Sequence, residues 1–276
     1  TGGWWEGDPY TYQDGAIYVD ADCSPSIVGC RIEGNHGGNG GGIFSWFSSP
    51  RVEDCQFVEN SAGGSGGGMY SIGGAPEVVN CVFVGNTAHR GGGLGLRQTD
   101  GSVQSTIFAG NEAGSTGGAV WASNSAVTLT NCTLYANEAY YGNGIASVFY
   151  CNVELRNSLI CFNRRPGHAT HCEDEGTIHA QCTNVYGNML GDWTSCLNGQ
   201  EGVEGNVCSD PFLCSSDPIG NFDWSIRDDS PCAPDVSGCG LMGAEDIGCY
   251  GTPCEQVTWG ELKARFRRFS VHSEGE

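Results

Sequence analysis

Histidine and cysteine are concentrated in one short stretch of this sequence. His168, His171, Cys172, His179 and Cys182 follow the spacing H-x2-H-C-x6-H-x2-C. Imidazole nitrogens and thiolates are the ligands that zinc prefers, so the stretch contains a candidate metal site in which His168, His171 and His179 would be ligands. The Glu-Asp-Glu run that follows Cys172 has the oxygen donors that calcium prefers, although no EF-hand or nonapeptide calcium repeat is present.

The same residues also have a purely structural interpretation. The chain has 16 cysteines, and a high, even count is typical of disulfide bonding in an oxidising compartment. Cys161, Cys172 and Cys182 would then be bridged, and the histidines would lie on the surface. We favour this interpretation, which predicts a secreted or cell-surface protein without a bound cofactor.

The elements that position these residues are sequence repeats. Each repeat contains one asparagine, and a glycine cluster follows most of these asparagines. No glycine cluster lies between the last two of them, which is where the histidine stretch is found. We therefore expect that stretch to leave the regular repeat. The repeats are marked by seven asparagines at intervals of 25 or 26 residues: Asn35, Asn60, Asn86, Asn111, Asn137, Asn163 and Asn188.

Other positions in the repeat form aligned columns as well. Three residues before each of the first six asparagines stands a large apolar side chain: Ile32, Phe57, Phe83, Phe108, Leu134 and Ile160. Eight residues before them stand Ile27, Val52, Val78, Val103, Leu129 and Leu155. Five residues before them is a column of small side chains: Cys30, Cys55, Cys81, Thr106, Cys132 and Ser158.

The pattern between these columns predicts short strands rather than helices. Apolar and polar residues alternate, β-branched residues are frequent, and glycine interrupts each unit. Units of this length fit several strands joined by bends, and stacked units pair as parallel strands about 4.8 Å apart. The predicted fold is all-β: a right-handed parallel β-helix with coils of 25 or 26 residues.

Asparagine and glycine suit the bends of such a coil. Stacked asparagines can bond side-chain amide to side-chain amide and to backbone, as in other stacked-strand structures. Asparagine also tolerates the left-handed backbone that a tight bend needs. The glycine clusters suit a second bend, either because φ is positive there or because backbone crowds backbone.

The cysteines of the small-residue column allow two interpretations. Cys30, Cys55 and Cys81 fall in consecutive coils, so their Cα atoms lie within disulfide range. Side chains in a parallel stack point the same way, however, which keeps the β-carbons apart. We favour buried free thiols that act as small apolar groups. Since Thr and Ser also occur in the column, we infer that its requirement is size.

The repeat resembles a known family. The motif pairs Gly-Gly-Gly-Ile43 with Phe57-Val-Glu-Asn60 and Gly-Gly-Ala119-Val120 with Phe108-Ala-Gly-Asn111 resemble the GGA(I/L) and FxxN motifs of chlamydial polymorphic outer-membrane proteins. Similar repeats occur in secreted bacterial right-handed β-helix proteins. The resemblance covers about residues 12–190 and implies a surface or secreted protein with adhesive roles. The chain has no β-barrel translocator, unlike the chlamydial proteins, which leaves the export route open.

The sequence divides into four segments. Residues 1–14 precede the repeats and begin with a threonine, which we interpret as a processed or truncated start. Residues 15–190 hold the β-helix repeats. Residues 191–254 contain seven cysteines, and we expect one or two irregular coils there that form a disulfide-rich cap over the core.

Residues 255–276 form a basic amphipathic tail. Trp259, Leu262, Phe266 and Phe269 share one helical face, which predicts a short C-terminal helix or strap. It either docks on its own acidic rod or holds a neighbouring molecule, and disorder is a third alternative. The candidate assembly contacts are in this tail and at the N-terminus: Trp4, Trp5, Trp259, Phe266 and Arg267.

Composition limits the partners. With 12 basic and 32 acidic residues the net charge is −20, so nucleic acid is not an expected partner. The chain has no run of 18 apolar residues, so we expect no membrane span. No column of outward carboxylates forms either, because Glu53 and Asp54 align with Val79 and Asn80 in the next coil.

We therefore expect an extracellular structural or adhesive protein rather than an enzyme. Exposed strand edges at the N-terminal end would allow self-association, including head-to-tail filaments, or contact with a surface partner. The alternative is a β-helix that binds or cleaves carbohydrate, with a glycan as its partner. A third class is a metal-binding protein that uses the histidine stretch.

Overall fold

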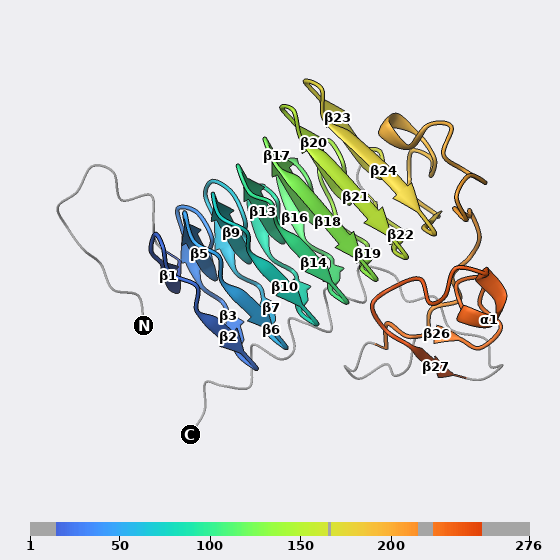
Figure 1. Ribbon diagram of the computed structural model, residues 1–276, viewed down its shortest axis with the longest axis horizontal. Helices are drawn as coiled ribbons and strands as arrows, with labels where there is room; N and C mark the ends of the chain where they lie inside the picture. The colour runs from blue at the N-terminus through green and yellow to red at the C-terminus, as the bar shows by residue number, and fades with distance from the viewer. Residues whose placement is uncertain (1–14, 165–166, 215–222, 250–276) are drawn as a thin grey trace.

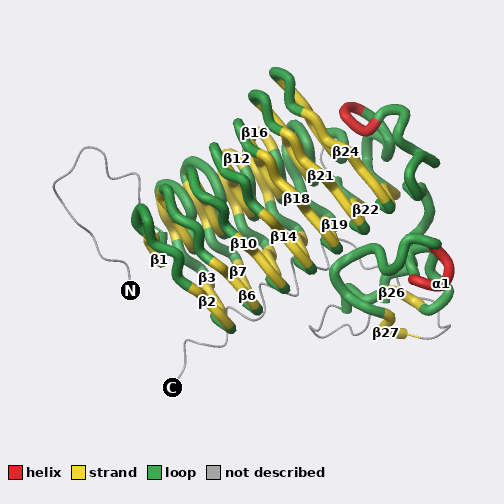
Figure 2. The backbone as a smooth tube through the Cα atoms, viewed as in Figure 1, coloured by secondary structure: helices red, strands yellow, loops and turns green. Residues whose placement is uncertain are grey.

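The structure is a computed structural model that describes residues 15–164, 167–214 and 223–249. Its coils are stacked along one axis, as Figure 1 shows, and each of the three main sheets has seven strands. Each coil contributes one strand to each of three parallel sheets, which we name sheets A, B and C. Figure 2 shows that bends and loops join these short strands at every corner. The predicted parallel β-helix is confirmed.

The strands that begin each coil form sheet A: β1 (Ile17–Val19), β5 (Ile43–Trp46), β9 (Met69–Ile72), β13 (Leu94–Arg97), β17 (Val120–Ser123), β20 (Ile145–Val148) and β23 (Thr170–Glu173). Sheet B follows with β2 (Ser26–Val28), β6 (Arg51–Glu53), β10 (Glu77–Val79), β14 (Ser102–Gln104), β18 (Ala126–Thr130), β21 (Asn152–Arg156) and β24 (Thr177–Gln181).

Sheet C completes each coil with β3 (Arg31–Glu33), β7 (Gln56–Val58), β11 (Val82–Val84), β15 (Ile107–Ala109), β19 (Thr133–Tyr135), β22 (Leu159–Cys161) and β25 (Asn184–Tyr186). A fourth sheet, sheet D, is present in four coils as β4 (His36–Gly37), β8 (Ser61–Ala62), β12 (Thr87–Arg90) and β16 (Glu112–Thr116).

The register between coils follows the repeat. Val78 pairs with Val52 and Val103 in sheet B, and Phe83 pairs with Phe57 and Phe108 in sheet C. The three phenylalanine rings stack with centroids 4.3 and 4.9 Å apart. Both apolar columns lie in the interior, where these rings are fully buried. Stacking of identical side chains therefore builds the core along the axis.

The glycine cluster has two separate steric causes. Gly91 has a φ of +61°, a backbone conformation that side chains other than glycine rarely adopt. Its neighbour Gly92 has no such φ, but a Cβ atom there would lie 2.6 Å from the carbonyl oxygens of Glu112 and Gly118 in the next coil. The sequence suggested either a positive φ or close approach of backbone as the reason for the cluster. The first applies to Gly91 and the second to Gly92.

The left-handed backbone at the asparagine bend lies one residue earlier than we predicted. The asparagines themselves do not have positive φ angles. The residue before each of them does, which leaves the asparagine free to point inward. These preceding residues are Gly34, Glu59, Gly85, Gly110, Ala136, Phe162 and Gly187.

The remaining described elements belong to the C-terminal region: the 3-10 helix η1 (Ser195–Leu197), strands β26 (Ile226–Arg227) and β27 (Ile247–Cys249), and the helix α1 (Pro234–Ser237). Three disulfides lie in or reach into this region: Cys172–Cys196, Cys182–Cys239 and Cys214–Cys249. The predicted disulfide-rich C-terminal region is confirmed.

We predict that Gly92→Ala lowers the free energy of unfolding by about 1–3 kcal/mol, because the new methyl group forces two coils apart. Gly101→Ala is the matched control, since a Cβ there would make ordinary contacts of 3.5 Å. Urea denaturation followed by circular dichroism measures both. Equal stability of the two variants would show that coil spacing does not require the glycine.

Candidate functional site

The seven repeat asparagines form a continuous hydrogen-bonded ladder along the axis. Each side-chain Nδ2 donates to Oδ1 of the asparagine in the next coil, over 2.8 to 3.4 Å. The same Oδ1 accepts a second bond, from the backbone N–H of the preceding asparagine. Asn60 to Asn163 are fully buried, so these bonds satisfy polar groups that water cannot reach.

The ladder also ties the interior of each coil to the one before it. Asn111 Nδ2 donates at 2.9 Å to the carbonyl oxygen of Phe83, which belongs to the preceding coil. Asn86 and Asn137 make the equivalent bonds to Phe57 and Phe108. One asparagine thus links three successive coils, and its replacement leaves unpaired groups in each of them.

An aspartate ends the ladder. Asn188 donates its backbone N–H and its Nδ2 to Asp192 Oδ1, at 2.8 and 2.9 Å. Asp192 takes the position that the next asparagine would occupy, although it lies four residues along rather than one full coil. An ionised carboxylate accepts hydrogen bonds but has none to donate. The ladder therefore stops at this residue.

The small-residue column is a second hydrogen-bonded ladder. Thr106 Oγ1 donates to the carbonyl of Gln104 at 2.8 Å and accepts from the N–H of Cys81 at 3.3 Å. Cys132 and Ser158 repeat the pattern, with Cys132 N–H donating to Ser158 Oγ at 3.1 Å. Size alone does not explain the column: its residues share a hydroxyl or thiol that can donate and accept.

Cysteines of this column are free thiols in the structure. Cys55, Cys81 and Cys132 are buried, and Cys30 is half-buried. Burial raises the pKa of Cys81 and of Cys132 to about 12, because a thiolate would lose its hydration. Cys81 and Cys132 are therefore protonated at neutral pH and act as weak hydrogen-bonding groups of the interior.

The histidine stretch does not leave the repeat, contrary to our prediction. His171 and Cys172 lie in β23, and His179 lies in β24, both paired in register with the preceding coil. Strand pairing in sheets A and B survives the loss of the glycine cluster, because the cluster shapes only the bend before sheet A. The stretch is therefore the regular seventh coil.

The three candidate metal-binding histidines have separate partners. His168 Nδ1 lies 2.9 Å from Thr194 Oγ1, and His171 Nε2 lies 3.6 Å from a carboxylate oxygen of Glu173. Cys172 and Cys182 are bonded to Cys196 and Cys239, whereas Cys161 is a buried free thiol. Across the described ranges, no three His, Cys, Asp or Glu side chains converge as metal ligands would.

His179 bridges two carboxylates along the axis. Its Nδ1 lies 3.2 Å from Glu154 in the sixth coil, and its Nε2 lies 3.1 Å from Glu204 in the C-terminal region. The side chain is half exposed, so these contacts are solvated. They connect the last coil to the segment that covers it.

Side-chain amides cover the exposed edge of the last coil. Gln200 accepts from the N–H of Ala180 at 2.8 Å and donates to the carbonyl of Ile178 at 2.9 Å. Asn206 accepts from the N–H of Thr183 and donates to the carbonyl of Ala180. The two side chains thus form hydrogen bonds with backbone groups that would otherwise pair with another strand.

Apolar residues of the cap close the end of the core. Trp193 and Leu197 are buried and pack on the interior cluster of the coils. The disulfide between Cys172 and Cys196 ties η1 to the end of sheet A. Residues 192–207 therefore form a cap, which we define as the segment from Asp192 to Val207.

Beyond the cap, the chain turns back along the flank of sheet C, where we had expected only further capping. Trp224 packs against Val84, Ile107 and Ala109, which face outward from sheet C. Figure 1 shows β26, β27 and α1 beside the later coils rather than beyond them. Apolar residues on this outer face need cover, and the C-terminal segment supplies it.

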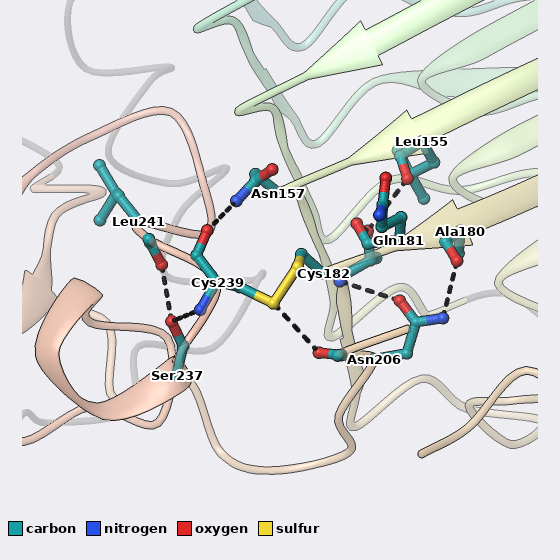
Figure 3. Close-up of a disulfide and its surroundings, with 12 residues drawn as sticks. Leu155, Asn157, Ala180, Gln181, Cys182, Asn206, Ser237, Cys239 and Leu241 are labelled. Atoms are coloured by element: carbon teal, nitrogen blue, oxygen red, sulfur yellow. Dashed lines mark hydrogen bonds between the residues drawn. A yellow bond between two sulfur atoms is a disulfide. The ribbon is translucent and has the colours of Figure 1, made fainter. Parts of the chain in front are cut away.

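A disulfide and two asparagines fasten this flank segment. Cys239 is bonded to Cys182, and its carbonyl accepts a bond from Asn157 Nδ2 at 2.7 Å, as Figure 3 shows. Asn131 Nδ2 donates to the carbonyl of Leu241 at 3.0 Å. Asn131, Asn157 and Cys182 are the left-handed residues that end sheet B in successive coils, so one column of bends anchors the segment.

A row of outward aromatic residues on sheet A was missed from the sequence. Tyr18, Phe44, Tyr70 and Trp121 stack from coil to coil, with centroid distances of 5.7, 5.8 and 6.5 Å. An apolar residue follows each glycine cluster, and the aromatic side chains occupy the position after it. Aligning that position between repeats would have revealed the row. Tyr70 and Trp121 lean together across Gly95, which occupies the row between them.

The candidate assembly contacts Trp4, Trp5, Trp259, Phe266 and Arg267 lie outside the described residues. Among the residues that are described, no helix has the length and apolar character needed to cross a bilayer.

No protein-family model, curated protein or solved structure matches this chain. The resemblance to polymorphic outer-membrane proteins therefore rests on the repeat motifs, while the parallel β-helix rests on the strand pairing itself.

We predict that Asn111→Ala lowers the free energy of unfolding by about 3 kcal/mol or more, because it leaves several buried groups unpaired at about 1–3 kcal/mol each. Asn152→Ala, at an exposed position on sheet B, should stay within about 0.5 kcal/mol of the native protein. Urea denaturation compares them. A loss at Asn111 no larger than at Asn152 would contradict a stabilising ladder.

Thiol labelling should separate the two kinds of free cysteine. In native protein at pH 8, iodoacetamide should label the exposed Cys23, whereas Cys55, Cys81 and Cys132 react only in denaturant. Burial and nearby Asp192 raise the pKa of Cys208 to about 11, so its labelling should accelerate steadily as pH rises toward that value. Peptide mass spectrometry measures each site, and rapid native labelling of Cys132 would contradict the buried column.

Proposed function

We propose that this protein is an extracellular structural or adhesive rod that presents its flanks to a partner. The observation that carries the proposal is a set of three disulfides: two fasten the cap and the flank segment to the last coil, and Cys214–Cys249 lies within the flank segment. Disulfides of this kind are retained in oxidising compartments and are rare in the cytosol. The proposal assigns no catalytic activity.

Rigidity along the axis supports a structural role. Seven coils at about 4.8 Å each give a rod about 30 Å long, held by the asparagine ladder and the small-residue column. Each coil is stabilised mainly by its neighbours, as in other solenoids. Such a rod holds side chains on its outer faces at fixed spacing, which suits repeated contacts with an extended partner.

The cap limits how copies of the protein could associate. In a head-to-tail filament, the next molecule would have to contact the cap, because Gln200 and Asn206 already occupy edge groups of the last coil. Edge-to-edge stacking of coils at this end is therefore disfavoured. Self-association, if it is part of the function, would use the flanks or the N-terminal coil.

A second candidate function is carbohydrate binding. The exposed aromatic side chains beside sheet A support it, because aromatic side chains offer apolar ring surfaces beside polar groups. Trp46 is half-buried and Phe47 is exposed at the edge of this face. The two proposals are compatible, since an adhesive rod needs a ligand.

The location and oxidation state of native material test the proposal. We expect the protein outside the cell or on its surface, with Cys172–Cys196, Cys182–Cys239 and Cys214–Cys249 linked in a non-reducing peptide map. Protein found only in the cytosol, with these six cysteines reduced, would refute it. Electron microscopy of the same material would show whether it forms fibres or single rods.

A further inference from the structure

Two exposed arginines of the coils differ from the ion-paired arginines of sheets B and C. Arg31, Arg51 and Arg156 each contact a carboxylate from their own strand or the next coil. Arg90 and Arg97 are exposed and make no ion pair with any described carboxylate. In a chain with 32 acidic residues, two such cations are available for an anionic partner.

The two arginines converge on the aromatic row of sheet A. The guanidinium carbon of Arg90 lies 5.6 Å from the centre of the Trp121 ring, a cation–π contact. Arg97 ends β13, and its charge, together with that of Arg90, opposes the rise that burial causes in the pKa of Tyr70. Tyr70 pairs with Gly95, and Arg97 lies two residues further along β13, on the same face of the sheet.

Gly95 shapes the surface between them. It occupies the aromatic row between Tyr70 and Trp121, and a Cβ atom there would lie 2.8 Å from the Tyr70 ring. Tyr70 and Trp121 are 4% and 5% exposed, so their rings support the arginines instead of offering open faces. The Arg90 guanidinium lies over the Trp121 ring.

An aromatic rim continues the same face toward the N-terminal coils. Trp46, Ile72 and Arg97 occupy one row of sheet A in consecutive coils. Trp46 contacts Phe47 edge-to-face with ring centroids 4.9 Å apart, and Phe47 is 49% exposed. At about 4.8 Å per coil, Trp46 is about 10 Å from Arg97 along the axis.

We propose that this arginine–aromatic patch, formed by Trp46, Tyr70, Arg90, Arg97 and Trp121, binds an acidic polysaccharide. The proposal rests on the adhesive function and names its ligand class. The planar guanidinium groups pair with carboxylate or sulfate groups of the sugar chain, a geometry that favours two parallel hydrogen bonds. Trp46 and Phe47 contact the apolar faces of neighbouring sugar rings.

Because the net charge of the chain is −20, long-range electrostatics do not attract an acidic ligand, and direct contacts at the patch must hold it. At physiological ionic strength the screening length is about 8 Å, so distant carboxylates of the rod have little effect on a ligand held at the patch. An acidic peptide would satisfy the arginines but would not need the aromatic rim. The rim is the observation that favours a sugar chain.

The test uses the purified full chain in isothermal titration calorimetry with four probes. The probes are polygalacturonate, dextran sulfate, neutral dextran and poly-glutamate. We expect binding to polygalacturonate or dextran sulfate, none to neutral dextran, and weaker binding to poly-glutamate than to the acidic sugars. The double variant R90Q/R97Q should weaken binding about tenfold or more, a loss of about 1.4 kcal/mol. The matched control R31Q removes an arginine from sheet C and should stay within about twofold. Trp46→Ala should weaken binding several-fold while R31Q does not.

Four results would overturn the proposal. They are no binding to either acidic polysaccharide, equal binding to neutral dextran, equal losses in R31Q and R90Q/R97Q, and poly-glutamate binding as tightly as the sugars with no effect of W46A. The last would point to an acidic peptide instead. Circular dichroism shows whether each variant folds. Because the ligand is tested in vitro, these results are independent of where the native protein is found.

Discussion

Each coil of this protein must satisfy its polar groups on the coil above and the coil below, and the rest of the structure depends on that constraint. Backbone N–H and C=O groups do so through the parallel sheets, and the asparagine amides do so inside the bend. An amide side chain suits the position because it has both a donor and an acceptor, so it can bond in two directions. The same requirement explains the hydroxyls and thiols of the small-residue column.

A ladder of this kind needs an end, and the cap shows how the chain provides one. Asp192 replaces the next asparagine with a group that only accepts, while Gln200 and Asn206 bind edge groups of sheet B and of the bend that follows it. A polar side chain can replace a strand locally without starting a new coil. The disulfide at Cys196 then fixes this segment, which has little apolar surface of its own.

Within the intact repeat, sequence alone predicted the interior columns, although it misplaced the left-handed bend residue by one position and missed the aromatic row of sheet A. The interior columns, the Asn111 ladder position and the short strands follow from spacing, because stacked coils place equivalent residues above each other. It failed where contacts are not periodic. Nothing in the spacing indicates that Trp224 returns to cover Ile107, since those residues are 117 positions apart and no repeat relates them.

The candidate sites show the same division. The histidine stretch was misjudged because a missing glycine cluster was taken as the loss of the coil, whereas His179 retains its strand register. The arginine–aromatic patch was missed because no single repeat contains it: Arg90 and Trp121 come from different coils and meet only when the coils stack. A surface patch on a solenoid combines residues from several repeats, so a motif within one repeat does not reveal it.

Native-state hydrogen exchange of the asparagine side-chain amides tests the central claim most directly. NMR resolves the Nδ2 protons of Asn60, Asn86, Asn111 and Asn137 from those of the exposed Asn152. If the ladder holds the coils together, the four buried amides should exchange only with opening free energies close to that of global unfolding. Exchange of the buried amides at the rate of Asn152 would contradict the ladder as the feature that stabilises the rod.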